Sequence, residues 1–186
     1  MNALKLHYAN ASLIAAALEA LYNLLSDDAK VISVHRDQLL NEMLQLYDTN
    51  PDIVYHRVKV EFQGEPGDDF GGLTKDLYTS LWMQILSTYF VGESAVVPHL
   101  SLYKHAEQRH HYRAIGRILA HSIALLKTFP PRLSRCTVLC LAFGSAQVSD
   151  DMLLRDFRSV ASVNFFSPFK YCNTLFIRLI YAFLTA

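Results

Sequence analysis

Apolar residues recur at helical spacing in four stretches of this chain. The clearest stripe has an apolar side chain every three or four positions, at Leu73, Leu77, Tyr78, Leu81, Trp82, Ile85, Leu86 and Tyr89. Comparable stripes run over Ser12 to Leu25, Arg36 to Tyr47 and Glu107 to Lys127. A period of about 3.6 residues places such side chains on one face of a helix, where they pack against a core. The pattern therefore predicts four core helices.

A second pattern precedes the clearest helix. Apolar and polar side chains alternate over residues 58–62 (Val-Lys-Val-Glu-Phe), which is the period of a strand with one buried face. Further upstream, the polar residues Ser26-Asp27-Asp28 separate the first helix from the apolar run Val31–Val34. We take this polar break as the boundary of an N-terminal helical extension, residues 1–28. Together these elements predict an α+β fold that is mainly helical with a few short strands.

The helix expected over residues 107–127 has two faces. Its apolar stripe holds Ile115, Ile118, Leu119, Ser122, Ile123 and Leu126. A narrower face is formed by Gly116, Ala120 and Ala124, whose small side chains would let another element pack closely. Pro130-Pro131 is expected to end this helix.

Shorter elements are expected on either side of that helix. Val91–Leu102 contains glycine, serine and proline and predicts a loop or a short extended piece. The apolar spacing over Leu133–Phe143 predicts a short helix closed by Gly144, and Ser149 before two aspartates is typical of a helix N-cap.

The most unusual stretch of the sequence is a turn at residues 64–72, Gly-Glu-Pro-Gly-Asp-Asp-Phe-Gly-Gly. It holds four of the 7 glycines, namely Gly64, Gly67, Gly71 and Gly72. Glycines gather where a backbone needs positive φ angles or approaches another element closely. Asp69 is expected to cap backbone N–H groups of this turn or of the following helix.

The turn invites a phosphate-loop interpretation, which its residues do not support. Gly67 and Gly72 have the required spacing, but Leu73 stands where the phosphate-binding lysine should be. Glu65, Asp68 and Asp69 would repel a nucleotide, and their spacing does not follow a calcium loop. We therefore expect no cofactor here.

Charge and cysteine content narrow the class of protein. Seventeen basic and 17 acidic residues cancel, and without a basic run we expect no nucleic-acid partner. The odd set Cys136, Cys140 and Cys172 suits a reduced intracellular protein, cytoplasmic or nuclear. The apolar segment Leu175–Leu184 is shorter than the roughly 20 residues that span a bilayer, so no membrane is expected.

The histidines and cysteines of the chain are the residue types most often found in metal sites and as catalytic nucleophiles. His105, His110, His111 and His121 cluster around one helix, but they lack the pairing with an acidic residue that a zinc protease needs. We expect them on the surface or at helix ends, with no metal. Cys136 and Cys140 lie one helical turn apart on an apolar stripe and Cys172 lies among phenylalanines, so all three are expected to pack in the interior.

Three blocks of the sequence, taken together, resemble the larger N-terminal lobe of the HECT family of ubiquitin ligases. The run from Val31 to Leu40 is similar to the opening segment of that lobe. The segment Phe62–Tyr78 resembles its strand, glycine-acidic turn and helix, with Asp69, Gly71 and Gly72 in the family's Asp-x-Gly-Gly pattern and Asp76 where a glutamate is typical. Gly116-Arg117-Ile118-Leu119 resembles the second landmark of the lobe, with alanine following where glycine is expected.

The resemblance implies an incomplete HECT N-lobe over residues 29–160, followed by an apolar tail at 161–186. Family members pass ubiquitin from a conjugating enzyme to a ligase cysteine and then to a substrate lysine. That cysteine belongs to a separate C-terminal lobe, which we expect to lie outside this chain, so no catalytic residue is assigned. The expected partners are a ubiquitin-conjugating enzyme and ubiquitin. Self-association through exposed apolar surface is a further expectation.

The sequence is compatible with two functions. One is a fragment of a ubiquitin-protein transferase, and the other is a noncatalytic module that binds a conjugating enzyme or ubiquitin. A reactive cysteine would distinguish them.

Overall fold

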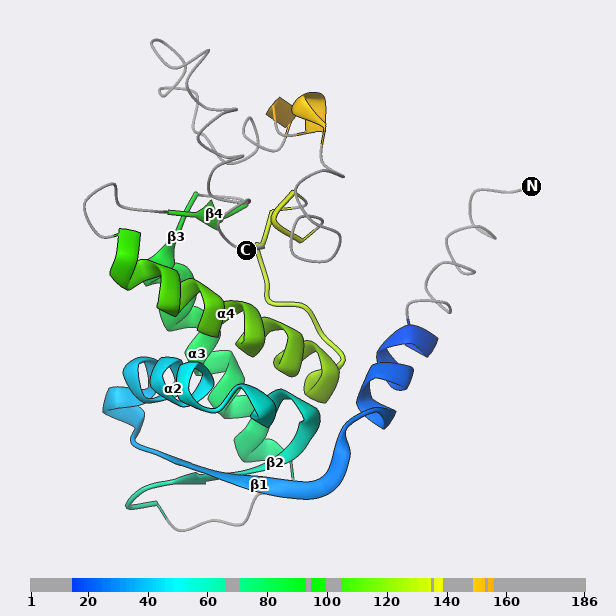
Figure 1. The fold of residues 1–186 in the computed structure, drawn as a ribbon, viewed down its shortest axis with the longest axis vertical. Coiled ribbons are helices and arrows are strands. Elements are labelled where there is room, and N and C mark those ends of the chain that lie inside the picture. The colour runs from blue at the N-terminus through cyan, green and yellow to red at the C-terminus, as the bar shows by residue number, and fades with distance from the viewer. Residues whose placement is uncertain are drawn as a thin grey trace. The chain divides into compact units, whose positions relative to one another are not determined.

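The computed structural model describes residues 15–65, 71–92, 95–99, 105–134, 136–138, 149–152 and 154–155. It has the expected α+β character, with helices predominating over a few short strands (Figure 1). The chain divides into two compact units. Unit 1 comprises Met1–Leu81 with Arg117–Phe129, and unit 2 comprises Trp82–Gly116 with Pro130–Ala186.

Unit 1 is built on two parallel strands, β1 (Ser26–Val34) and β2 (His56–Phe62). Ile32 pairs with Val60 and Val34 with Phe62, and all four side chains are buried. The expected alternation in β2 is therefore confirmed. Parallel strands need a crossover connection, and here it is formed by a 3₁₀ turn at Arg36–Gln38, helix α2 (Leu39–Thr49) and a second 3₁₀ turn at Pro51–Tyr55.

The core of unit 1 lies between the sheet and three helical segments. These are α2, the first half of α3 (Gly72–Tyr89) and the second half of α4 (His105–Leu126). Their fully or nearly fully buried side chains are Leu39, Met43, Leu44 and Tyr47 of α2, Leu77, Tyr78 and Leu81 of α3, and Ile118, Leu119, His121 and Ser122 of α4. The three helices thus follow the predicted stripes, and each helix begins and ends within three residues of its stripe.

The N-terminal part of unit 1 differs from expectation in one respect. Residues 15–23 are helical as predicted, but β1 begins at Ser26, which is aligned with His56. The Ser26-Asp27-Asp28 break is therefore wrong as a description of local structure, because these polar residues are extended strand. Sequence patterning missed this because residues 26–31 are all exposed and leave no buried–exposed alternation. The domain boundaries near residues 28 and 160 stay predictions.

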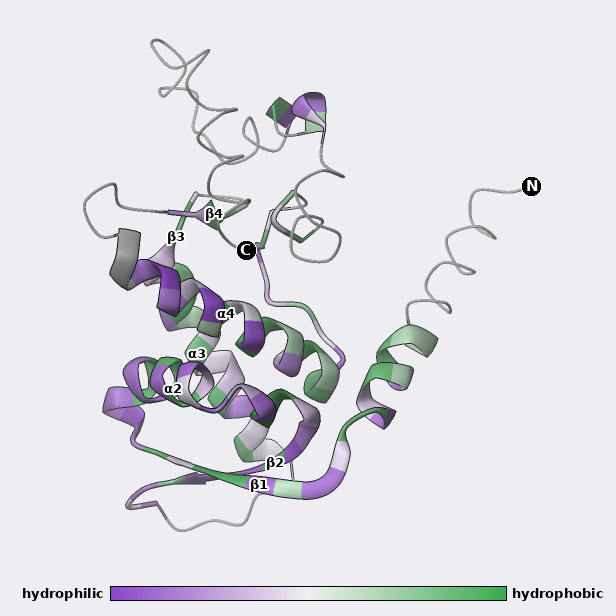
Figure 2. Ribbon diagram, in the orientation of Figure 1, coloured by the Kyte–Doolittle hydropathy of each residue, from purple (hydrophilic) through white to green (hydrophobic). Residues whose placement is uncertain are grey.

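The helix at residues 15–23 is joined to the rest of unit 1 by charged side chains. The ring of Tyr22 has the guanidinium of Arg57 at 4.7 Å on the side of β2 and the ammonium of Lys127 at 4.6 Å. Lys127 also pairs with Glu19. Leu24, just after the helix, is 79% exposed (Figure 2 shows this stretch as largely hydrophobic).

Unit 2 contains the second half of α3, the first half of α4 and a small antiparallel pair, β3 (Phe90–Val91) and β4 (Val97–Pro98). The stretch expected to be a loop or short extended piece thus contributes β4. The hydroxyl of Tyr112 lies 2.7 Å from the carbonyl oxygen of Tyr89 and 2.6 Å from that of His99, so its single proton is shared between these two acceptors. These bonds fasten α4 to the end of α3 and to the residue after β4.

The end of α4 and the elements after it are only partly as expected. The helix stops at Leu126, before Pro130-Pro131, because Lys127 takes a left-handed conformation with φ 56°. Residues 136–138 are helical, and the hydroxyl of Ser149 accepts the N–H of Met152 at 3.3 Å, which confirms the predicted N-cap. No described helix is long and apolar enough to cross a membrane.

Candidate functional site

The glycine-acidic turn is the candidate site, and its two described ends show why it needs glycine. Gly64 has a φ of 83° and Gly71 a φ of 93°, a left-handed region that side chains other than glycine rarely adopt. A Cβ atom at either position would meet no described atom within 4 Å. Backbone conformation, and not lack of space, therefore selects glycine here. The expected positive φ angles are confirmed at these two positions.

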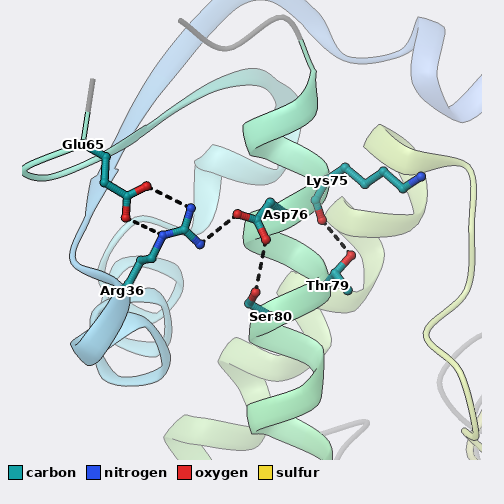
Figure 3. Close-up of polar contacts among 6 residues, drawn as sticks. All are labelled: Arg36, Glu65, Lys75, Asp76, Thr79 and Ser80. Carbon is teal, nitrogen blue, oxygen red and sulfur yellow. Dashed lines mark hydrogen bonds and ion pairs between the residues drawn. The ribbon is translucent and has the colours of Figure 1, made fainter. Parts of the chain in front are cut away.

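One arginine ties the turn to the elements on both sides of it. The guanidinium of Arg36, just after β1, binds the carboxylate of Glu65 through two hydrogen bonds, Nε to Oε1 at 2.5 Å and Nη2 to Oε2 at 3.0 Å (Figure 3). Its third nitrogen, Nη1, lies 2.8 Å from Oδ2 of Asp76, in the second turn of α3. The same guanidinium stacks 3.8 Å from the ring centre of Phe62, at the end of β2. Arg36 thus joins β1, β2, the turn and α3.

The electrostatics of this cluster keep Arg36 charged. The hydrogen bonds to Glu65 and then to Asp76 raise the pKa of Arg36 above its usual value. The three side chains are between 42% and 46% exposed, so solvent screens the ion pairs. Bidentate geometry contributes direction as well as energy. The cluster is therefore a positioning device for the turn, with each carboxylate already bound to a cation.

Gly116 and Arg117, which form the second landmark of the sequence, have different structural roles. The guanidinium of Arg117 donates to the carbonyl of Tyr47 at 2.7 Å, in the last turn of α2. Helix α2 has no basic residue of its own in that turn, so Arg117 supplies the positive charge that a helix C-terminus favours. A Cβ at Gly116 would meet no described atom within 4 Å, and Ala120 is exposed. The predicted close packing on the narrow face is wrong at these two positions.

A buried hydrogen-bonded chain joins the helices of unit 1. The hydroxyl of Tyr47 lies 2.6 Å from that of Tyr78 and 2.6 Å from Nδ1 of His121. Nε2 of His121 lies 2.8 Å from the carbonyl oxygen of His56, which can only accept. Nε2 therefore carries the proton, Nδ1 accepts from Tyr47, and Tyr47 in turn accepts from Tyr78. Every donor in the chain has a partner.

Burial sets the protonation of this chain. It lowers the pKa of His121 to about 4, and it raises the pKa values of Tyr47 and Tyr78 above 10. All three groups are consequently neutral at neutral pH. The side chains are at most 1% exposed, so the chain is sealed from solvent and acts in packing. The expectation that His121 lies on the surface or at a helix end is wrong, because its two nitrogens find partners inside.

The structure describes only some of the other residues that were predicted to form the turn. Gly72 is the first residue of α3, whereas Gly67 and Asp69 lie outside the described residues, so the proposed cap by Asp69 stays a prediction. Sequence reasoning missed the role of Arg36. The available signal was its position directly after an apolar strand, followed at a distance by a turn with surplus carboxylates.

The described residues include neither an exposed cysteine nor a cluster of metal ligands. Cys136 is a buried free thiol, 2% exposed, as expected for a core position, and Cys140 and Cys172 lie outside the described residues. Within the described ranges, no three histidine, cysteine or carboxylate side chains gather as metal ligands. His110 is exposed, and His111 lies 2.9 Å from the hydroxyl of Tyr89.

Comparison of the sequence with models of known protein families finds no match, and comparison with curated proteins finds no relative. The geometry of the turn and its anchors is therefore the basis on which a function can be argued.

Proposed function

We propose that this chain contributes the scaffold lobe of a HECT-type ubiquitin ligase, with the larger-lobe fold that the sequence resembles. The observation that carries the proposal is the position of Arg36. It lies in the block similar to the opening of the lobe, and it binds Glu65 of the turn block and Asp76 of the helix that follows. Blocks that are far apart in sequence thus share one ion cluster.

The residue at position 76 adds a specific argument. The family typically has a glutamate where this chain has Asp76, which departs from the pattern but keeps a carboxylate. That carboxylate receives Nη1 of Arg36 at 2.8 Å. A need for negative charge at this point explains why aspartate and glutamate would both serve. The departure from the family pattern is therefore compatible with the same structural role.

The role we propose for the lobe is mechanical and not catalytic. By family resemblance it docks a ubiquitin-conjugating enzyme and holds a second lobe that carries the acceptor cysteine. A thiolate must be accessible to attack a thioester. Cys136, the described cysteine, is 2% exposed and does not meet this requirement.

The burial of Cys136 also favours a second candidate function, a noncatalytic module. Such a module would bind a conjugating enzyme or ubiquitin without accepting ubiquitin itself, and could compete with intact ligases. Both candidates predict binding, but they differ in whether the chain works as part of a larger enzyme.

A thioester assay tests the absence of a catalytic cysteine. The chain is incubated with activating enzyme, a conjugating enzyme, ubiquitin and ATP, and products are compared with and without reductant. We expect no reductant-sensitive ubiquitin adduct on the chain. An adduct that is lost in Cys172→Ala but kept in Cys136→Ala would show that this chain carries its own nucleophile.

A binding assay tests the scaffold itself. The chain is titrated against a panel of conjugating enzymes, and saturable binding to at least one is expected. The Gly71→Val variant is a negative control, since a β-branched residue does not tolerate a φ of 93° and the turn would be distorted. No saturable binding to any member of the panel, by a chain with native helix content, would contradict both candidate functions.

A further inference from the structure

Residues 15–24, drawn in blue in Figure 1, lie against the rest of unit 1 with little apolar burial. Eight of these ten side chains are exposed, with Leu24 at 79%. Among the described residues, the first buried side chain is that of Leu25, directly before β1. The hydrophobic effect scales with the apolar area removed from water. It therefore fastens the chain at Leu25 and contributes little to holding residues 15–24.

The contacts that hold this segment are electrostatic. The ring of Tyr22 has the guanidinium of Arg57 at 4.7 Å and the ammonium of Lys127 at 4.6 Å. Lys127 also pairs with Glu19 of the segment. Arg57 is kept in place by Asp27 of β1, with Nη1 to Oδ1 at 2.5 Å. Two cations of unit 1 thus share one aromatic ring, and each is also paired with a carboxylate.

Solvent reaches all of these charged groups. The side chains of Glu19 and Lys127 are 54% and 37% exposed, and those of Asp27 and Arg57 are 86% and 34% exposed. Ion pairs between exposed side chains contribute little stability and are screened by salt. The contact between a cation and an aromatic ring is also electrostatic in origin. The core of unit 1 is held by apolar burial, which salt does not screen. The segment and the core should therefore respond differently to ionic strength.

The backbone at Lys127 gives a second indication. Its φ of 56° is left-handed, a conformation that costs free energy for residues other than glycine, and glycine is the usual residue just after a helix. Its N–H donates to the carbonyl of Ile123 at 2.9 Å, so this conformation closes α4. Strained residues of this kind are concentrated at functional and switch positions. Here the strained residue supplies the charge that contacts both Tyr22 and Glu19.

We propose that residues 15–24 form a strap that detaches from unit 1 by a local opening while the core stays folded. The hinge lies just before Leu25, whose buried side chain anchors the chain. Regions with few buried apolar contacts open at a lower free energy than the whole domain. Opening removes the ring from Arg57 and Lys127, and the carboxylate of Glu19 from Lys127. The strap thereby controls access to two cations on unit 1, and this role does not depend on the proposed ligase function.

Hydrogen exchange of the full chain, followed by mass spectrometry at pH 7, tests the strap. The amides of residues 19–24 are compared with those of α2 at 20 mM and 500 mM NaCl. At 20 mM NaCl the strap amides should exchange at least about tenfold faster than those of α2, but more slowly than in an unstructured peptide of the same sequence. At 500 mM NaCl their exchange should be about threefold faster again, whereas that of α2 should change less than about 1.5-fold.

Two variants test which contacts hold the strap. Glu19→Gln should speed exchange of the strap at least about twofold at 20 mM NaCl and weaken its response to salt. Asp37→Asn is the matched control, because it makes the same change of charge at an exposed position in the 3₁₀ turn before α2, and it should leave the strap unchanged. Lys127→Met, which removes the charge from the other side of the pair, should act in the same direction as Glu19→Gln.

Several outcomes would overturn the proposal. They are strap amides as strongly protected as those of α2, exchange of the strap that does not respond to salt, and equal effects of Glu19→Gln and Asp37→Asn. Exchange at 20 mM NaCl as fast as in the unstructured peptide would also overturn it, since the segment would then not be docked.

Discussion

The guanidinium of Arg117 on α4 binds the backbone carbonyl of Tyr47 at 2.7 Å, and so caps a helix that begins 78 residues earlier in the chain. Its Nη1 atom also lies 3.4 Å from the carbonyl of Asp48 and 4.0 Å from its carboxylate. A long-range side chain thus does what a basic residue in the last turn would ordinarily do for a helix.

Removing this cap should destabilise the protein. We expect Arg117→Ala to lower the free energy of unfolding by about 1–2 kcal/mol, because a charged hydrogen bond and a favourable helix-end charge are both lost. Urea unfolding followed by circular dichroism at 222 nm measures this. Arg113→Ala on the same helix is the matched control and should change stability by less than about 0.5 kcal/mol. Equal effects of the two variants would show that the cap has no energetic role.

The two neighbouring glycines that begin α3 should respond differently to substitution. Gly71 has a φ of 93°, whereas Gly72 is the first residue of the helix and has no positive φ. A Cβ has open space at both. Gly71→Ala should therefore cost about 1–2 kcal/mol through backbone strain alone, and Gly72→Ala should be neutral or stabilising. Thermal unfolding of both variants measures the difference, and a cost at Gly72 alone would contradict the assigned conformations.

The ion cluster at Arg36 gives a prediction about position 76. Asp76→Glu, which introduces the acid typical of the HECT family, should keep the bond to Arg36 and leave stability within about 0.5 kcal/mol. Asp76→Asn keeps the size of the side chain but removes its charge, and should cost up to about 1 kcal/mol, as expected for a partly exposed pair. The difference should shrink in 1 M salt, because screening weakens the charged pair. If Asp76→Asn is as stable as the wild-type protein at low salt, the ion pair between Arg36 and Asp76 contributes nothing to the free energy of unfolding.

Stability should fall as the solution is acidified from pH 6.5. Burial lowers the pKa of His121 from 6.5 to about 4, so between these values the unfolded chain binds a proton that the folded chain does not. Stability from this group is complete above pH 6.5 and is lost as the pH falls toward 4. The loss should reach about 2 kcal/mol at a pH of about 5.

Titration of Glu42 does not contribute to the loss of stability expected between pH 6.5 and pH 5. Hydrogen bonds from His35 lower the pKa of Glu42, and the stability that this contributes is lost only below the ordinary Glu42 pKa of 4.5. Urea midpoints between pH 7 and 5 should therefore fall in wild type. The slope should be much smaller in His121→Leu, whereas the exposed-site control His110→Gln should keep it. An unchanged slope in His121→Leu would assign the pH dependence to another group.

The order of hydroxyl groups in the buried chain predicts unequal costs of removing them. Tyr47 lies in the middle, so Tyr47→Phe leaves Nδ1 of His121 without its donor and Tyr78 without its acceptor. Tyr78→Phe removes only the terminal donor. We expect costs of about 2–3 kcal/mol and about 1 kcal/mol, respectively. Denaturant unfolding of the two variants checks this ranking, which the reverse order would contradict.

Local patterning predicted the parts of the fold in which a periodic apolar stripe coincides with a buried face. The apolar stripe from Leu73 to Tyr89 coincides with helix α3, Gly72–Tyr89, because its buried residues repeat at helical spacing. The positive φ angles of the turn were also predictable, because few residues other than glycine adopt them. The start of β1 was not predictable, because its first six residues are all exposed and show no alternation of buried and exposed side chains.

The contacts that give the candidate site its shape were not predictable from sequence. His121 bonds to groups 65 and 74 residues away, so its burial depends on tertiary packing that no local pattern encodes. The bond between Arg36 and Glu65 spans 29 residues and depends on β1 and β2 being parallel. Interactions of this kind follow from topology, which single-sequence periodicity does not determine.

The buried chain from Tyr78 to the carbonyl of His56 also restricts how the three helices of unit 1 can be arranged. If α2 were rotated by one residue, Leu46 or Asp48 would occupy the place of Tyr47. His121 would then lose its donor, or an aspartate would be left in an apolar interior, and both cost free energy. Purely apolar faces would tolerate such a slip. The hydroxyl of Tyr47 thereby favours the native rotation of α2 over arrangements in which the helix is rotated by one residue.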